Sequence, residues 1–180
     1  DHSGMVPFLF RMGYRGPVYC TPPTRDISAL LALDYISVSF KQAKKMLFDI
    51  NDVKEMVKHT ITLNWGEVTD ITPDLRLTLY NSGHILGSSI CHLHIGHGAH
   101  NLAYTGDLKF LRSKLLEPAE TRFPRLETVI IEITYGGKED VLAPREEAEH
   151  EVITSITETI ERGGKILIPV LGVGRAQEIM

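Results

Sequence analysis

Residues 75–107 read LRLTLYNSGHILGSSICHLHIGHGAHNLAYTGD, and this stretch decides the fold class of the chain. Apolar and polar side chains alternate through residues 75–80, which is the period of a half-buried strand. Two further strands are predicted over residues 89–95 and 101–105, and the glycine-rich turn between them indicates a hairpin. We therefore expect a sheet with antiparallel strands at the centre of the chain.

The flanking residues carry helical as well as strand patterns, so we predict a mixed α/β architecture. Helices are expected over residues 4–12, 25–35 and 40–48, with another begun by Asn51 or Asp52 and ending near Lys58. Short strands are expected over residues 18–20, 61–64, 67–71 and 127–132, and a buried one over residues 165–170. Residues 144–162 are the clearest predicted helix, and Thr24 is expected to cap helix 25–35.

The composition is that of an ordinary globular domain, with 180 residues, 43% hydrophobic and 23% charged side chains. It excludes a disordered, collagen-like or disulfide-framework chain, since the two cysteines, Cys20 and Cys91, lie in apolar stretches. No apolar run approaches the ~20 residues that cross a bilayer, so we expect a cytoplasmic protein with no membrane partner. The 19 basic and 23 acidic side chains give a net charge of −4, which does not favour a basic nucleic-acid-binding domain.

Both ends of the chain are unusual for a complete protein. The first residue is Asp1 rather than methionine, and Met180 lies inside a predicted helix that has no stop signal. We therefore expect a fragment that is truncated at both ends. In that case the mild acidity describes only a piece and does not exclude a nucleic-acid substrate.

Side chains that suit a metal ion stand at the ends of the predicted strands. His84 lies in a glycine-flanked loop, Asp107 follows the strand at 101–105, and Glu132 ends the strand at 127–132. Imidazole and carboxylate together are typical ligands of zinc or manganese. Each residue alone is as typical of a surface loop or a turn, so the indication comes from the whole set.

The set resembles successive motifs of the metallo-β-lactamase superfamily, and more narrowly of its β-CASP ribonucleases, which include the archaeal cleavage and polyadenylation specificity factors. The motifs that carry the resemblance are Asp1-His2, Ser82-Gly83-His84-Ile85-Leu86-Gly87, Tyr104-Thr105-Gly106-Asp107 and Ile131-Glu132-Ile133-Thr134-Tyr135-Gly136. Residues 18–24 and residues 163–178 agree with the same pattern. The motifs extend over nearly the whole chain and keep both their order and their spacing.

This resemblance implies a partial αββα sandwich of the metallo-β-lactamase type over residues 1–172, with residues 173–180 starting the β-CASP insertion. It implies a zinc-dependent endonuclease, with 5′–3′ exonuclease activity as an addition, in RNA 3′-end processing or transcription termination. Two metal ions about 3.5–4 Å apart clamp a phosphodiester and activate the water that hydrolyses it. The implied partners are RNA, RNA polymerase or transcription-elongation factors, and a second copy in a full-length homodimer.

The resemblance also assigns a role to each candidate residue. Asp1 and His2 bind the second of two zinc ions, His84 completes the first zinc site, and Asp107 bridges both ions. Glu132 is the catalytic acidic residue that supports a histidine near the leaving group. The other histidines are expected outside the chain, so the fragment is expected to be inactive alone.

Two further residues bear on the substrate. Arg175, at the start of the last predicted helix, is expected to face RNA. Ile133 is a departure from the pattern, because many relatives carry serine there, and it puts in doubt only a hydrogen bond beside Glu132.

Two other functions stay open, a non-catalytic scaffold and a small-molecule hydrolase of the same superfamily. The β-CASP-like Glu132 and the run Gly174-Arg175-Ala176-Gln177-Glu178 argue against the small-molecule hydrolase. A second histidine motif, His92-Leu93-His94-Ile95-Gly96-His97, looks like a metal signature. No carboxylate joins it, so we expect a solvated hairpin face rather than a metal site.

Overall fold

A computed structural model describes residues 2–180, and it has the mixed α/β fold that the sequence predicted. The chain divides into an N-terminal unit, Asp1–Ile131, and a C-terminal unit, Glu132–Met180. The domain boundary after residue 172, which the family resemblance implies, is a different boundary from this division and stays a prediction.

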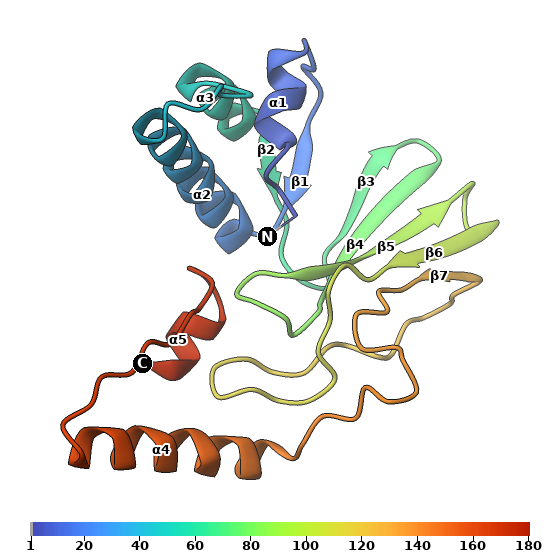
Figure 1. Ribbon diagram of the computed structural model, residues 1–180. Coiled ribbons are helices and arrows are strands. Elements are labelled where there is room, and N and C mark those ends of the chain that lie inside the picture. Colours follow the sequence, from blue (N-terminus) through green and yellow to red (C-terminus); the bar gives the residue numbers. More distant parts are fainter. Residues whose placement is uncertain (1) are drawn as a thin grey trace. The chain divides into compact units, whose positions relative to one another are not determined.

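Three helices pack together at one side of the N-terminal unit (Figure 1). They are α1 (Val6–Arg11), α2 (Pro22–Lys41) and α3 (Ile50–Lys58). Their shared core is formed by buried apolar side chains, namely Phe10, Ala32, Phe48, Val53 and Met56. Burial of such side chains is worth about 1.5–3 kcal/mol each, so this cluster holds the three helices together.

Helix α2 differs from the sequence prediction in both its start and its length. It begins after Thr21, which is the N-cap in place of the expected Thr24, because Pro22 and Pro23 fit a first turn where no backbone N–H is needed. It then continues to Lys41 as one helix, so the separate helix expected over residues 40–48 is wrong. The helix α3 is capped by Asp49, in a capping box with Asp52, and not by either predicted residue.

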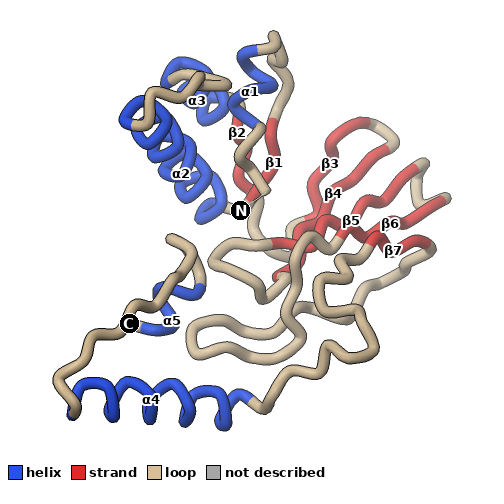
Figure 2. Tube along the Cα trace, in the orientation of Figure 1, coloured by secondary structure: helices blue, strands red, loops and turns tan. Residues whose placement is uncertain are grey.

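The strands of the N-terminal unit form a small sheet and a larger one (Figure 2). Strands β1 (Val18–Cys20) and β2 (Thr60–Thr62) pair in parallel. The five-stranded sheet contains β3 (Val68–Thr72), β4 (Leu75–Asn81), β5 (Ser89–Ile95), β6 (His100–Tyr104) and β7 (Thr128–Ile130), in that order. Its pairs are antiparallel except the β6–β7 pair, which is parallel.

This topology determines where the loops of the larger sheet meet. Because β5 is antiparallel to both β4 and β6, the carboxyl ends of β4 and β6 point to the same edge of the sheet. The residues after β4 and after β6 therefore come together, although they are about twenty positions apart. The predicted His84 and Asp107 are in these two segments.

Each face of the larger sheet is covered within the N-terminal unit. On one face Leu77 and Leu79 are buried with Leu63, and Tyr19 of β1 packs against them. On the opposite face the segment after β6 returns over the sheet, where Phe123 meets Tyr80 edge to face at 5.2 Å. The apolar core of the sheet thus lies beside the strand ends that carry the polar loops.

The C-terminal unit contains two helices, α4 (Arg145–Glu161) and α5 (Arg175–Ile179). The first confirms the predicted helix over residues 144–162. A guanidinium nitrogen of Arg145 lies 3.8 Å from Glu178 and so links the two helices. The buried strand expected over residues 165–170 is wrong, because these residues are exposed and this unit holds no other strand among residues 132–180 to pair with it.

No helix within the described part of the chain is both long and apolar enough to cross a membrane.

Candidate metal centre

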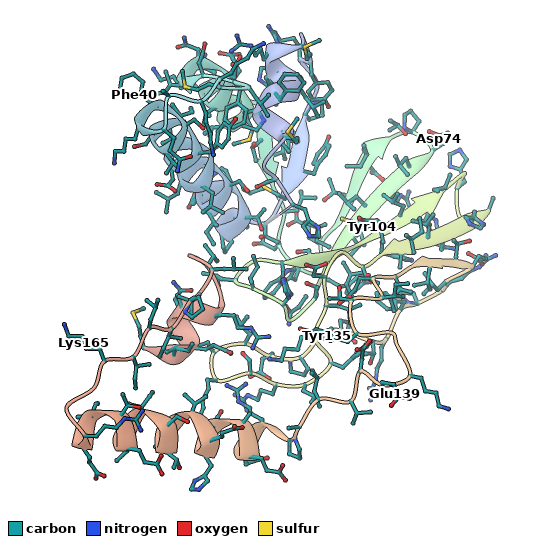
Figure 3. The ribbon with its side chains drawn as sticks, in the orientation of Figure 1. Phe40, Asp74, Tyr104, Tyr135, Glu139 and Lys165 are labelled. Carbon is teal, nitrogen blue, oxygen red and sulfur yellow. The ribbon has the colours of Figure 1, made fainter. Side chains whose placement is uncertain are left out.

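A cavity of about 400 Å³ lies in the N-terminal unit between the start of α2, strand β1 and the ends of β4 and β6. Its wall includes apolar side chains from the sheet together with the predicted residues His2, His84 and Asp107. Tyr104, labelled in Figure 3, ends β6 and contributes to the same wall while remaining half exposed. The cavity therefore joins a partly apolar pocket to polar groups at one rim, which is the usual construction of a ligand site.

Three predicted metal ligands lie among the described residues, and two of them, His2 and His84, meet at the carboxylate of the third, Asp107. The Nε2 atom of His2 lies 3.3 Å from Oδ2 of Asp107, and the Nε2 atom of His84 lies 3.5 Å from the same oxygen. These residues come from three segments that are distant in the sequence. Their side chains stay accessible to solvent, with 62% of His2, 33% of His84 and 30% of Asp107 exposed, so an ion or substrate is able to reach them.

The His84 loop is shaped by its own side chains. The hydroxyl of Ser88 accepts hydrogen bonds from the backbone N–H groups of His84, at 3.2 Å, and Ile85, at 3.1 Å. The amide oxygen of Asn81 accepts a bond of 3.0 Å from the N–H of Gly83. Because these contacts satisfy the backbone on both sides of His84, they fix the position from which its imidazole extends.

The His84 loop is also tied to the segment that follows Asp107. The backbone N–H of Lys109 donates to the carbonyl of Ser82 at 2.9 Å. Gly83 has φ +68°, and a Cβ placed there would lie 2.8 Å from both the Ala119 nitrogen and the Lys109 oxygen. Only glycine allows this close approach without strain, and the approach is what holds His84 beside Asp107.

The donor types at this site fit zinc. Neutral imidazole nitrogens and a carboxylate oxygen are standard zinc ligands, and here they converge on a cavity rim. Among residues 2–180, however, no group of three or more histidine, cysteine, aspartate and glutamate side chains is arranged to hold a metal ion by itself. The described residues therefore provide the right kind of donors but not a complete coordination sphere.

The two cysteines on the cavity wall, Cys20 and Cys91, have unreactive thiols. Burial raises the pKa of the Cys20 thiol to about 11, and burial also raises the pKa of Cys91. In the metal-free protein both thiols are thus protonated at neutral pH, so neither is an activated nucleophile.

The remaining predicted site residues are less closely placed. Asp1 lies outside the described residues. Glu132 lies two positions beyond the end of β7, because this strand ends at Ile130 rather than at residue 132, and its carboxylate accepts a 2.8 Å bond from the N–H of Thr134. Arg175 is the exposed first residue of α5. Glu132 and Arg175 belong to the C-terminal unit, so their roles at the site stay predictions.

In the second histidine motif His92 is buried and not solvated, which corrects the expectation for this residue, while His97 is exposed. His92 is only 6% exposed, and its Nε2 atom bonds the carbonyl of Arg125 at 3.0 Å. The Nδ1 atom of His94 lies 2.6 Å from the amide oxygen of Asn101, so this nitrogen carries the hydrogen. These contacts hold the two rings against the sheet, and the expectation that they form no metal site stays a prediction.

Comparisons with known proteins agree with the predicted family. The family model described as a metallo-beta-lactamase superfamily domain matches residues 3–129. The chain is 59% identical over 180 residues to the transcription termination factor FttA of Methanothermobacter thermautotrophicus, and equally so to that of Methanocaldococcus jannaschii. The identity to the Lokiarchaeum protein of the same name is 54%. Each match covers 100% of this chain but 28% of the relative, so the chain spans little more than a quarter of their length.

Proposed function

The chain belongs to the metallo-beta-lactamase superfamily, and from this premise we propose that it supplies part of a zinc-dependent centre that hydrolyses RNA during transcription termination. The name of its relatives supports the role in termination. The observation that carries the hydrolytic part is the meeting of two imidazoles on Asp107, within 3.5 Å, at the rim of a cavity. The N-terminal unit thereby presents donors of the type that a zinc hydrolase uses.

The proposal gives each of these residues a defined task. His2 and His84 would hold zinc through their imidazoles, Asp107 would contribute its carboxylate to both ions, and Asp1 would provide a further oxygen ligand. When bound, two zinc ions supply Lewis acidity toward a phosphodiester and lower the pKa of a water. The tight loops around His84 and Asp107 keep the donors in place before the substrate arrives, so little reorganisation is required during the reaction.

Residues of the C-terminal unit complete the proposal. Glu132 is proposed as the catalytic acidic residue, and Arg175 as a contact to the RNA backbone. The domain division also belongs to the proposal, with the metallo-β-lactamase core over residues 1–172 and the β-CASP insertion beginning at 173. We propose RNA as the partner of the assembled protein, at the full length of its relatives.

The test is to measure zinc content and RNA cleavage together in the full-length protein. We expect wild-type protein to bind zinc and cleave RNA, and Asp107→Ala to abolish cleavage and lower the zinc content. The matched control is Asp70→Ala, since this aspartate is 74% exposed and pairs only at the surface with Arg76. Near-normal cleavage by Asp107→Ala with both metals bound would overturn the assignment, and zinc binding without any cleavage would favour a scaffold.

A further inference from the structure

Two threonines at the start of α2 lie against the loop that carries His84. The hydroxyl of Thr21 is 2.7 Å from the carbonyl oxygen of Gly87, and the hydroxyl of Thr24 is 3.0 Å from the same oxygen. The two hydroxyls are 2.9 Å apart. The carbonyl of Gly87 thus accepts a hydrogen bond from each hydroxyl, although Thr21 is 66 positions and Thr24 is 63 positions away in the sequence.

The contact is enclosed and leaves little freedom. Thr21 is 3% exposed, so its hydroxyl makes these bonds away from bulk water. Gly87 has φ +82°, and a Cβ there would lie 2.7 Å from the Thr21 hydroxyl, 2.9 Å from Pro23 and 3.0 Å from the Thr24 nitrogen. The glycine is therefore needed for α2 to come this close, and the two hydroxyls use that approach.

The contact acts on the histidine through a short path. Gly87 is followed by Ser88, whose hydroxyl oxygen accepts hydrogen bonds from the backbone N–H groups of His84 and Ile85. Holding the carbonyl of Gly87 consequently holds the hydroxyl that positions His84. Without Thr21 and Thr24 the loop would keep its bonds to Lys109, Asn81 and Ser89, and it would lose its hydrogen bonds to α2.

We propose that Thr21 and Thr24 are positioning residues for His84, which fix the imidazole for metal binding from the side of α2. This inference rests on the proposed function, since it gives the threonines a role toward the metal that His84 would hold. Groups that orient a metal ligand typically affect metal affinity by about 10–100-fold when they are removed. Both threonines line the same cavity as His84, and in this inference they act on its imidazole through Gly87 and Ser88.

The experiment compares variants of the full-length protein that remove one hydroxyl each. Thr24→Val keeps the shape of the side chain and spares the N-cap, which Thr21 provides. Thr24→Ser restores the hydroxyl. The matched control is Thr69→Val, because the hydroxyl of Thr69 is also buried and has no hydrogen-bond partner within residues 2–180.

Two measurements are made on each variant, zinc affinity by competition with a chelator and amide hydrogen exchange in the metal-free protein. We expect Thr24→Val to bind zinc about 10-fold more weakly and to exchange faster at the amides of His84, Ile85 and Ser88. Thr24→Ser and Thr69→Val should remain like wild type in both measurements. A merely structural role would change global stability without this local signature.

The outcomes separate this inference from the proposed function. If wild-type protein binds zinc, equal affinity in Thr24→Val overturns the positioning role. If wild-type protein binds no zinc, the proposed function fails, and the metal role of the threonines fails with it. Unchanged exchange at residues 84–88 in Thr24→Val overturns the mechanical part of the inference in either case, and faster exchange supports it.

Discussion

Two groups of histidines lie in the N-terminal unit of this protein and have opposite characters. His2 and His84 extend from loops at a cavity rim and meet a carboxylate, and both remain accessible. His92 and His94 extend from strand β5, and their rings bond the carbonyl of Arg125 and the amide of Asn101. The second group is closer in spacing to a metal motif, yet only the first converges on a carboxylate.

The difference shows that the surroundings of a ring decide what a histidine does. A metal ligand needs a free ring nitrogen directed at other donors, and its opposite nitrogen is then oriented by a neighbour. In the β5 group one ring nitrogen of each histidine bonds a backbone carbonyl or an amide oxygen, and neither of these bonds is to a carboxylate. Substitutions in the two groups should therefore have different consequences.

The largest effect is expected from exchanging one histidine in each group for alanine in the full-length protein. His84→Ala should weaken zinc binding by more than about 100-fold, since even the loss of an orienting neighbour costs about 10–100-fold. His94→Ala should leave zinc affinity within about 2-fold, because its ring bonds only an amide side chain in the described structure. Equal losses of zinc in the two variants would erase the distinction between the groups.

A smaller effect is expected from Gly83, the glycine that lets the His84 loop approach the segment after Asp107. The reference is Gly66→Ala, since Gly66 has φ +76° with open space around it. This variant should cost about 1–2 kcal/mol of folding stability from the backbone conformation alone. Gly83→Ala should lower folding stability by about 1–3 kcal/mol more than Gly66→Ala does, because the added Cβ would overlap the backbone nitrogen of Ala119 and the backbone oxygen of Lys109. Native-state amide exchange at Ser82 and Lys109 measures the difference, and identical behaviour of the two variants would contradict the close approach.

The second group should matter for stability instead of metal binding. His92→Ala removes a buried ring that packs against Tyr80 and Phe123 and leaves the Arg125 carbonyl without its partner. We expect the free energy of opening that amide hydrogen exchange reports for β4 and β5 to fall by about 1–3 kcal/mol. Zinc content should stay at the wild-type value, and a parallel loss of zinc would show that the ring takes part in the metal site.

The smallest effect is expected from Glu127, whose carboxylate bonds the Asn101 side chain that in turn contacts His94. The Asn101 side chain above all, and then Arg125, lower the pKa of Glu127 from 4.5 to about 2. A lowered pKa in the folded state stabilises the protein fully above pH 4.5, and that contribution is lost as the pH falls from 4.5 to about 2. Acid unfolding of Glu127→Gln should lack this part of the pH dependence.

The control for this last change is Glu139→Gln, at an exposed position in the C-terminal unit. It should unfold in acid with the wild-type profile. A wild-type profile in Glu127→Gln as well would mean that the contact between Glu127 and Asn101 does not contribute to folding.

Much of the fold was predictable because its signals are local. The alternation through residues 75–80 predicted β4, and the turn of glycines after residue 95 predicted the β5–β6 hairpin. The prediction failed where a neighbour decides the outcome. Residues 165–170 have the composition of a buried strand but lack a pairing strand in the C-terminal unit, so they form no strand and are exposed.

The candidate site divides in the same way. The types of residue and their order in the motifs were sufficient to identify the family, since that information is contained in the sequence. They also singled out His2, His84 and Asp107, which the structure brings together, while the role of these residues as metal ligands stays a prediction. The threonines of α2 were missed as parts of the site. The Thr-Pro-Pro-Thr run signals a helix start, but nothing local indicates that its hydroxyls reach a carbonyl 63 positions away.

The sequence by itself determined the mixed α/β class, the family and the residues with metal-binding chemistry, because periodicity and side-chain type are properties of the chain. Only the tertiary structure decided which histidines approach a carboxylate and which are used in packing. The reason is that the antiparallel order of β4, β5 and β6 brings the ends of β4 and β6 to one edge. It also turns His92 toward Arg125, on the face opposite to the cavity residue Cys91.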